Sequence, residues 1–241
     1  MQKYSYGIKK SLLALSAFAM LGLSACTKCP ECQEANCPVA NCPTCPGTEV
    51  AAGTAAAQTA GTPLVAGAEE IVLPKPVGLS ATLYETLENR RSVRAYTDEA
   101  LTIEDVSNLL WSANGINRTD GKRTAPSARN RQSVSIYAIF PQGAYRYDHV
   151  GHKLVRVSNA DVRPLKLAPM ELLFTSNAED VLIRGIDAGT ASQNAALYCS
   201  AANLGTVIRM YRDPESTLPS ALKLQNGEHI LFSMAVGREK K

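Results

Sequence analysis

Three arginines and a serine gather in one short segment of the chain, at Arg90, Arg91, Ser92 and Arg94. A guanidinium group presents a planar fork of N–H donors that matches two phosphate oxygens, and a serine hydroxyl can add a hydrogen bond to the same group. The spacing therefore favours a phosphate-binding turn. Taken alone, the cluster is also compatible with a solvated surface or with a site for another anion.

Other chemistries have weaker candidates in the sequence. No serine-histidine-acid pattern, paired-carboxylate motif or P-loop stands out, and the chain has three histidines. His149 and His152 are three residues apart on an expected turn without a third ligand, so we interpret them as exposed loop residues and assign no metal site. Cys199 lies in an apolar helical pattern, which favours a buried structural thiol over a nucleophile. The difficult chemistry would then belong to a cofactor.

The N-terminus has the plan of a bacterial export signal over residues 1–25. Lys3, Lys9 and Lys10 precede an apolar run that is too short for a lasting transmembrane helix. Leu-Ser-Ala-Cys at residues 23–26 is typical of a lipobox, which predicts lipidation of Cys26 and anchoring of the protein at the cell envelope. Thr27 favours the outer membrane if the host has two. The alternative is an ordinary signal peptide with an incidental cysteine.

Residues 26–70 are predicted to form a tether. Five cysteines follow Cys26, at positions 29, 32, 37, 42 and 45, and most of them precede a proline. In an exported chain this pattern favours disulfides or crosslinks to another chain, although the CxxC spacing leaves a zinc or iron–sulfur centre open. From Gly47 to Gly67 the chain is mostly Ala, Gly and Thr, which cannot build a core.

Residues 71–241 fit a single domain in which strands and helices mix without a regular βαβ repeat, so the sequence predicts an α+β fold. A net charge of +3 is too mild to argue for nucleic acid. Leu83, Tyr84 and Leu87 give the first helix a face that could be buried. Helices are expected at 80–89, 102–114, 186–203 and 214–224, and strands at 133–140, 144–147, 153–157, 170–176, 206–211 and 229–236.

The order of several motifs between residues 73 and 239 resembles the nitroreductase family. It is most similar to the flavin-dependent dehydrogenase branch related to the oxidases that act on azoline-containing peptides. The motifs are RRSVR at 90–94, LLWSANGI at 109–116, TAPSA at 124–128, DAG at 187–189, QN at 193–194, LG at 204–205 and VGR at 236–238.

The resemblance implies a nitroreductase-like fold, with a mixed central sheet flanked by helices, in an intertwined homodimer that binds FMN at the subunit interface. Arg90, Arg91, Ser92 and Arg94 match the family's phosphate-binding turn, and Arg238 matches its basic residue near the C-terminus. The loop that borders the flavin ring is matched by Pro126, Ser127, Asn130 and Gln132. Met210 and Tyr211 fall at the N5 edge of the flavin, although Ile208-Arg209-Met210-Tyr211 departs from the usual family pattern there.

The implied reaction is a two-electron, hydride-transfer oxidoreduction of a small molecule through bound flavin. The donor would be NAD(P)H or, for an exported protein, a quinol, a thiol or a partner protein of the envelope. Two other functions remain open from the residues alone. One is a flavin-free, surface-anchored binding or structural lipoprotein that retains the fold, and the other is an envelope protein crosslinked through its cysteines.

Overall fold

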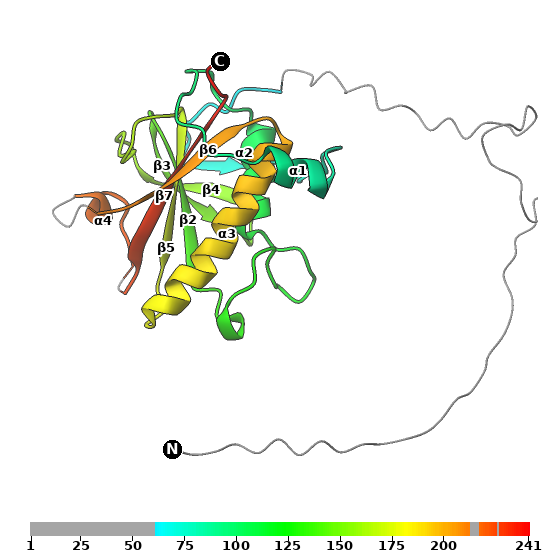
Figure 1. The fold of residues 1–241 in the computed structure, drawn as a ribbon. Coiled ribbons are helices and arrows are strands. Elements are labelled where there is room, and N and C mark those ends of the chain that lie inside the picture. The colour runs from blue at the N-terminus through cyan, green and yellow to red at the C-terminus, as the bar shows by residue number, and fades with distance from the viewer. Residues whose placement is uncertain (1–60, 213–216, 226) are drawn as a thin grey trace, which may run out of the picture. The chain divides into compact units, whose positions relative to one another are not determined.

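The structure, a computed structural model, describes residues 61–212, 217–225 and 227–241. The export signal, Cys26 and the cysteines at 29–45 lie outside the described residues. The described chain is built on a seven-stranded sheet with the order β1-β4-β3-β2-β5-β7-β6 (Figure 1). The strands are β1 (Glu70–Val72), β2 (Val134–Phe140), β3 (Gly143–Asp148), β4 (Lys153–Ser158), β5 (Met170–Ser176), β6 (Gly205–Met210) and β7 (His229–Gly237).

Each pair of neighbouring strands runs antiparallel, which differs from the mixed sheet that we expected. The reason is local, since β2, β3 and β4 follow one another through short turns and form a meander. A parallel bridge outside the strands joins Ser92 to Thr206. The α+β class and the six predicted strands are confirmed, and β1 is an element that the sequence analysis missed.

The helices are α1 (Leu83–Asn89), α2 (Ile103–Asn114), α3 (Val181–Ala201) and α4 (Leu218–Ala221), with a 3-10 turn, η1, at Ala128–Asn130. The Thr102 side chain accepts a hydrogen bond from the Asp105 amide and caps α2. The Asp180 carboxylate accepts from the amides of Leu182 and Ile183, so α3 begins at residue 181 rather than at 186. No helix in the described part of the chain is long and apolar enough to cross a lipid bilayer.

Helix α3 crosses one face of the sheet, and α1 and α2 lie beside its C-terminal half (Figure 1). Ala188, Ala191, Ala195 and Cys199 recur at helical spacing along α3 and are completely buried. Their small side chains let the helix backbone approach the sheet closely. The main core lies in this layer and includes Leu109, Phe174 and other large apolar side chains.

The structure differs from two expectations, one about the buried face of α1 and one about where the tether ends. Leu83, Tyr84 and Leu87 of α1 are 67%, 75% and 54% exposed, because α1 contacts α3 through its other side. The end of the predicted tether also belongs to the folded region. The amide of Leu64 donates to the Leu101 carbonyl, and the amide of Ile103 donates to the Thr62 carbonyl, so residues 62–64 pack against the start of α2.

The two histidines of the β3–β4 turn are half-buried rather than exposed. His152 lies 2.7 Å from the Ser107 hydroxyl through Nε2 and 2.9 Å from the Tyr147 hydroxyl through Nδ1. His149 Nε2 lies 2.9 Å from a guanidinium nitrogen of Arg123. Burial lowers the pKa of both imidazoles. They form structural contacts between the hairpin and the rest of the fold.

We predict that Cys199 is chemically protected in the folded protein. The thiol is completely buried, and burial, with a smaller contribution from the charge of Asp105, raises its pKa far above the ordinary value. Since the thiolate is the reactive form, iodoacetamide at pH 8 should modify the Cys199 peptide at least about a hundredfold more slowly in the native protein than in urea, as measured by mass spectrometry. Equal rates in the two conditions would contradict this packing.

Candidate functional site

A cationic cavity of about 510 Å³ lies where the arginine-rich turn meets the C-terminal segment. Arg90 and Arg91 come from the turn after α1, and Arg238 and Lys241 come from the segment after β7. The C-terminal part of α3 and the first residues of β6 complete the lining. The lining thus contains four cationic side chains and one acidic side chain, that of Glu239, so the cavity has the charge to hold an anion.

Backbone hydrogen bonds fix this turn in place. The amide of Val93 donates to the Thr206 carbonyl over 2.9 Å, which attaches the turn to β6. The amide of Thr97 donates to the Arg238 carbonyl, and the amide of Lys240 donates to the Ala95 carbonyl, both at a distance of 3.0 Å. These two bonds attach the turn to the C-terminal segment. Segments at the two ends of the folded region are thereby held around one cavity.

Gly205 permits the close approach of the turn to β6. A Cβ atom at this position would lie 2.7 Å from Cγ1 and 2.8 Å from Cβ of Val93, which is closer than real side chains pack. The Leu-Gly sequence at the end of α3 therefore has a steric role, because it brings the β6 backbone against the arginine-rich turn.

The arginines of the cavity differ in their partners. Arg91 forms an ion pair with Glu239, and Arg238 bonds to Glu99 over 2.8 Å and to Asp105 over 3.4 Å. Arg90 has no ion pair within the described part of the chain. An anion that enters must compete with Glu239 for Arg91, whereas Arg90 is available without such competition.

Ser92 and Arg94 are exposed and are not among the residues that line the cavity. Ser92 is held through its backbone, in the bridge to Thr206. The structure thus brings Arg90, Arg91 and Arg238 together, while Ser92 and Arg94 lie on the adjoining surface of the same turn.

The loop of residues 126–132 is organised by Asp187 of α3. One Asp187 carboxylate oxygen accepts from the Ala128 amide over 3.0 Å, and the other accepts from the Ser133 hydroxyl over 3.4 Å. The Ser127 hydroxyl accepts from the Gln132 amide over 2.9 Å and closes the loop on itself. Asp187 is only 2% exposed, and the sequence motif around it had given it no role.

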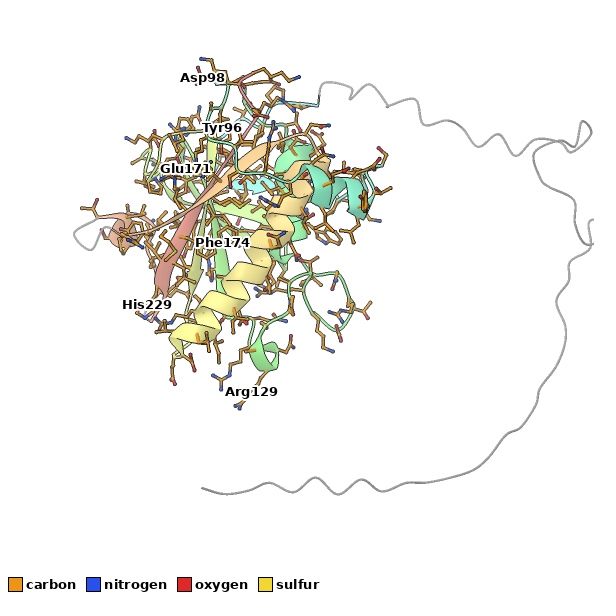
Figure 2. All side chains as sticks on the ribbon, in the orientation of Figure 1. Tyr96, Asp98, Arg129, Glu171, Phe174 and His229 are labelled. Atoms are coloured by element: carbon orange, nitrogen blue, oxygen red, sulfur yellow. The ribbon has the colours of Figure 1, made fainter. Side chains whose placement is uncertain are left out.

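This loop and the cationic cavity lie at different ends of α3. Thr190 of α3 donates to the Pro126 carbonyl, whereas Ser200 lines the cavity, and ten helical residues span about 15 Å. Figure 2 shows Arg129 of the loop at the opposite end of the folded region from Tyr96, which follows the arginine-rich turn. A single chain therefore does not enclose Pro126, Ser127, Asn130 and Gln132 in one pocket with the arginines.

Met210 and Tyr211 lie at the far end of β6 from the cationic cavity, about 17 Å along the strand. They line a separate cavity of about 380 Å³ together with Asp161, Arg163 and Thr217. Met210 is 63% exposed. The Tyr211 hydroxyl is buried and finds no hydrogen-bond partner among the described residues.

A buried carboxylate shapes this second cavity. Glu171 of β5 is completely buried and accepts hydrogen bonds from the amides of Leu165 and Leu167, over 3.0 and 3.4 Å. Burial raises the pKa of Glu171, and the backbone amides partly oppose this shift. Glu171 thereby holds the loop that carries Asp161 and Arg163 against the sheet.

Comparisons with known proteins identify relatives of the chain. Residues 87–238 match the model of the nitroreductase family. A Methanocaldococcus jannaschii protein with the provisional name nitroreductase is 30% identical over 184 residues, which cover 65% of this chain and 91% of that protein. A crystal structure from Ralstonia eutropha JMP134, also provisionally named a nitroreductase, is 32% identical with a TM-score of 0.68, and the match covers 75% of this chain and 95% of that one.

A more distant structure supports the fold alone. It is a provisionally named nitroreductase from Anabaena variabilis, 20% identical with a TM-score of 0.55, and the match covers 66% of this chain and 38% of that one.

We predict that Gly205→Ala lowers stability by about 1–3 kcal/mol, because the added methyl group must displace Val93 or the β6 backbone. Urea unfolding followed by circular dichroism would measure the loss. Val93→Ala removes two of the three nearest atoms, so the double variant should lose less than the sum of the two single variants. Strict additivity would count against this contact.

We predict that Asp187→Ala destabilises the protein by about 1–3 kcal/mol, since it leaves the Ala128 amide and the Ser133 hydroxyl without their acceptor. Hydrogen exchange should rise in residues 126–133 and remain unchanged in β7. Asp187→Asn, which keeps one carbonyl oxygen, is the matched control and should lose less. An alanine variant with wild-type exchange in the loop would show that Asp187 does not organise it.

Proposed function

Because the chain belongs to the nitroreductase family of oxidoreductases, which are generally flavin-dependent, we propose that it binds FMN and transfers electron pairs to or from a small molecule. The observation that carries the proposal is the cationic cavity formed by Arg90, Arg91 and Arg238 at the start of β6. When bound, FMN would supply two-electron hydride chemistry that the side chains of this chain do not offer.

The residues around the cavity fit the phosphate end of such a cofactor. Arg90 and Arg91 would bind the phosphate oxygens, and Arg238 and Lys241 would add positive charge. Ser92 and Arg94, on the outer surface of the turn, complete the group that we assign to phosphate binding. From this cavity β6 leads to Met210 and Tyr211, which we assign to the flavin-ring end of the site.

We further propose that the functional unit is a homodimer, in which the loop carrying Pro126, Ser127, Asn130 and Gln132 meets the arginines of the other copy. The separation of the two residue groups along α3 supports this proposal. Exposed apolar side chains near both ends of α3 supply surfaces for association. They are Leu83, Tyr84 and Leu87 of α1 and Val181, Leu182 and Ile186 of α3.

The electron donor follows from where the protein works. We propose lipidation at Cys26 and anchoring at the bacterial cell envelope, on the strength of the export signal and lipobox. NAD(P)H is the donor that the family resemblance implies, and a quinol, a thiol or a partner protein would replace it outside the cytoplasm. The RRSVR and TAPSA motifs favour the dehydrogenase branch related to azoline oxidases.

One observation favours a flavin-free binding or structural lipoprotein as the second candidate. Arg91 and Arg238 are already paired with Glu239, Glu99 and Asp105. If these ion pairs persist, the arginines join the C-terminal segment to α2 and to the turn without any ligand.

We predict that the full chain, purified and mixed with FMN, shows a stoichiometric flavin absorption spectrum after gel filtration. Arg90→Ala combined with Arg91→Ala should weaken FMN binding at least about tenfold, because charge-assisted hydrogen bonds to the phosphate are lost. Arg118→Ala, which removes an exposed arginine outside the cavity, is the matched control and should bind like the wild type.

Glu239→Gln separates the two candidate functions. If Arg91 binds phosphate, removing the competing carboxylate should leave FMN binding as tight as in the wild type or make it tighter. A folded wild type that stays colourless with added FMN would reject the flavoenzyme and favour the flavin-free lipoprotein.

A further inference from the structure

A second sizeable cavity, of about 520 Å³, lies away from the arginine-rich turn. Its floor is the face of β2, β3 and β4 that points away from α3, since side chains alternate along each strand and the intervening residues belong to the core beneath that helix. It shares no lining residue with the cationic cavity at Arg90 and Arg91. Its lining includes Arg123, Arg146, Tyr137, Val155, Val157 and Leu222.

Arg123 is a buried cationic residue of this lining and is only 8% exposed. One terminal nitrogen donates to the Val134 carbonyl over 3.1 Å, and the other lies 2.9 Å from His149 Nε2. Its Nε atom is buried and finds no partner among the described residues. No ion pair joins Arg123 to a carboxylate in that part of the chain, so a buried cation stands without a counter-charge, which is costly.

A second guanidinium lines the same cavity. Arg146 is half-buried and donates to the Ser135 hydroxyl over 3.1 Å, and it too has no ion pair within the described residues. Lys153, also in the lining, is engaged by Glu70 outside the cavity. Asp148 is the acidic residue of the lining, and its carboxylate accepts from the Val150 amide. Burial and the charge of Arg146 lower the pKa of Arg123, as expected for two cations without an anion between them.

One part of the lining is apolar, while polar side chains make up much of the remainder. In the apolar part, Tyr137 and Leu222 are buried and belong to the cluster on this face of the sheet, and Val157 packs against that cluster. An inorganic ion would leave these side chains facing empty space. A ligand that combines one anionic group with an apolar body would use both parts of the lining.

We propose that this cavity binds an organic acid, with its carboxylate at Arg123 and Arg146 and its apolar body against Tyr137, Val157 and Leu222. A carboxylate offers two oxygens to planar guanidinium donors and supplies the missing counter-charge. Gln132 stands at the edge of the cavity, but its side-chain amide donates to the Gly121 carbonyl and to Asn130. The test of this site does not require the cofactor.

The test uses benzoate, added to the full chain in which the arginine Nε atoms are labelled with nitrogen-15. The Nε–H resonance of Arg123, identified from its absence in Arg123→Lys, should shift saturably with benzoate. Benzyl alcohol, which has the same ring without the charge, should cause no saturable shift. Inorganic phosphate, which has charge without the apolar body, should bind at least about tenfold more weakly than benzoate.

The binding variant is Arg146→Gln, because glutamine can still donate to Ser135 and should preserve the fold. It should weaken benzoate binding about tenfold or more, with an unchanged unfolding midpoint. Arg118→Gln, on an exposed arginine outside the cavity, should bind benzoate as the wild type does. Absence of a saturable shift, wild-type affinity in Arg146→Gln, or equal binding of benzyl alcohol would overturn the proposal. Phosphate binding as tight as benzoate would reduce the cavity to a site for an inorganic anion and overturn the assigned ligand class.

Discussion

The close contact between α3 and the sheet determines the position of the 126–132 loop and of one wall of the cationic cavity. It depends on a row of buried alanines and Cys199, whose small side chains keep the helix near the strands. The same helix holds the 126–132 loop through Asp187 and borders the cationic cavity through Ser200. A larger residue in that row would move both regions at once, so packing and site geometry are set by one surface.

Charge is distributed unevenly around this scaffold. At the arginine-rich turn, Glu239, Glu99 and Asp105 compensate two of the arginines and hold the C-terminal segment in place. On the other face of the sheet, Arg123 and Arg146 lack such partners within the described residues. The first arrangement suits an anion that displaces carboxylates of the protein from the arginines. The second suits a ligand that itself supplies the negative charge.

Much of the fold could be predicted from the sequence because local signals were strong. β-Branched and aromatic residues indicated β2, and apolar residues at helical spacing indicated α2. The predictions were wrong where tertiary contacts determine which side chains are buried. Leu83 and Leu87 have helical spacing, but α3 packs against another side of α1. His149 is half-buried and contacts Arg123, which is distant in sequence. The arginine cluster was visible as a motif, whereas its distance from the 126–132 loop depends on the length of α3, which no motif encodes.

The walls of the cationic cavity come from segments that are far apart in the sequence. Arg91 and its partner Glu239 are 148 residues apart, and the turn at 90–97 has its backbone partners in β6 and in the last few residues. Contacts between residues so far apart in sequence form slowly and require nearly the whole domain to be present. A chain still emerging from the ribosome therefore has no such cavity, and an anion bound there would report a polypeptide that has finished folding.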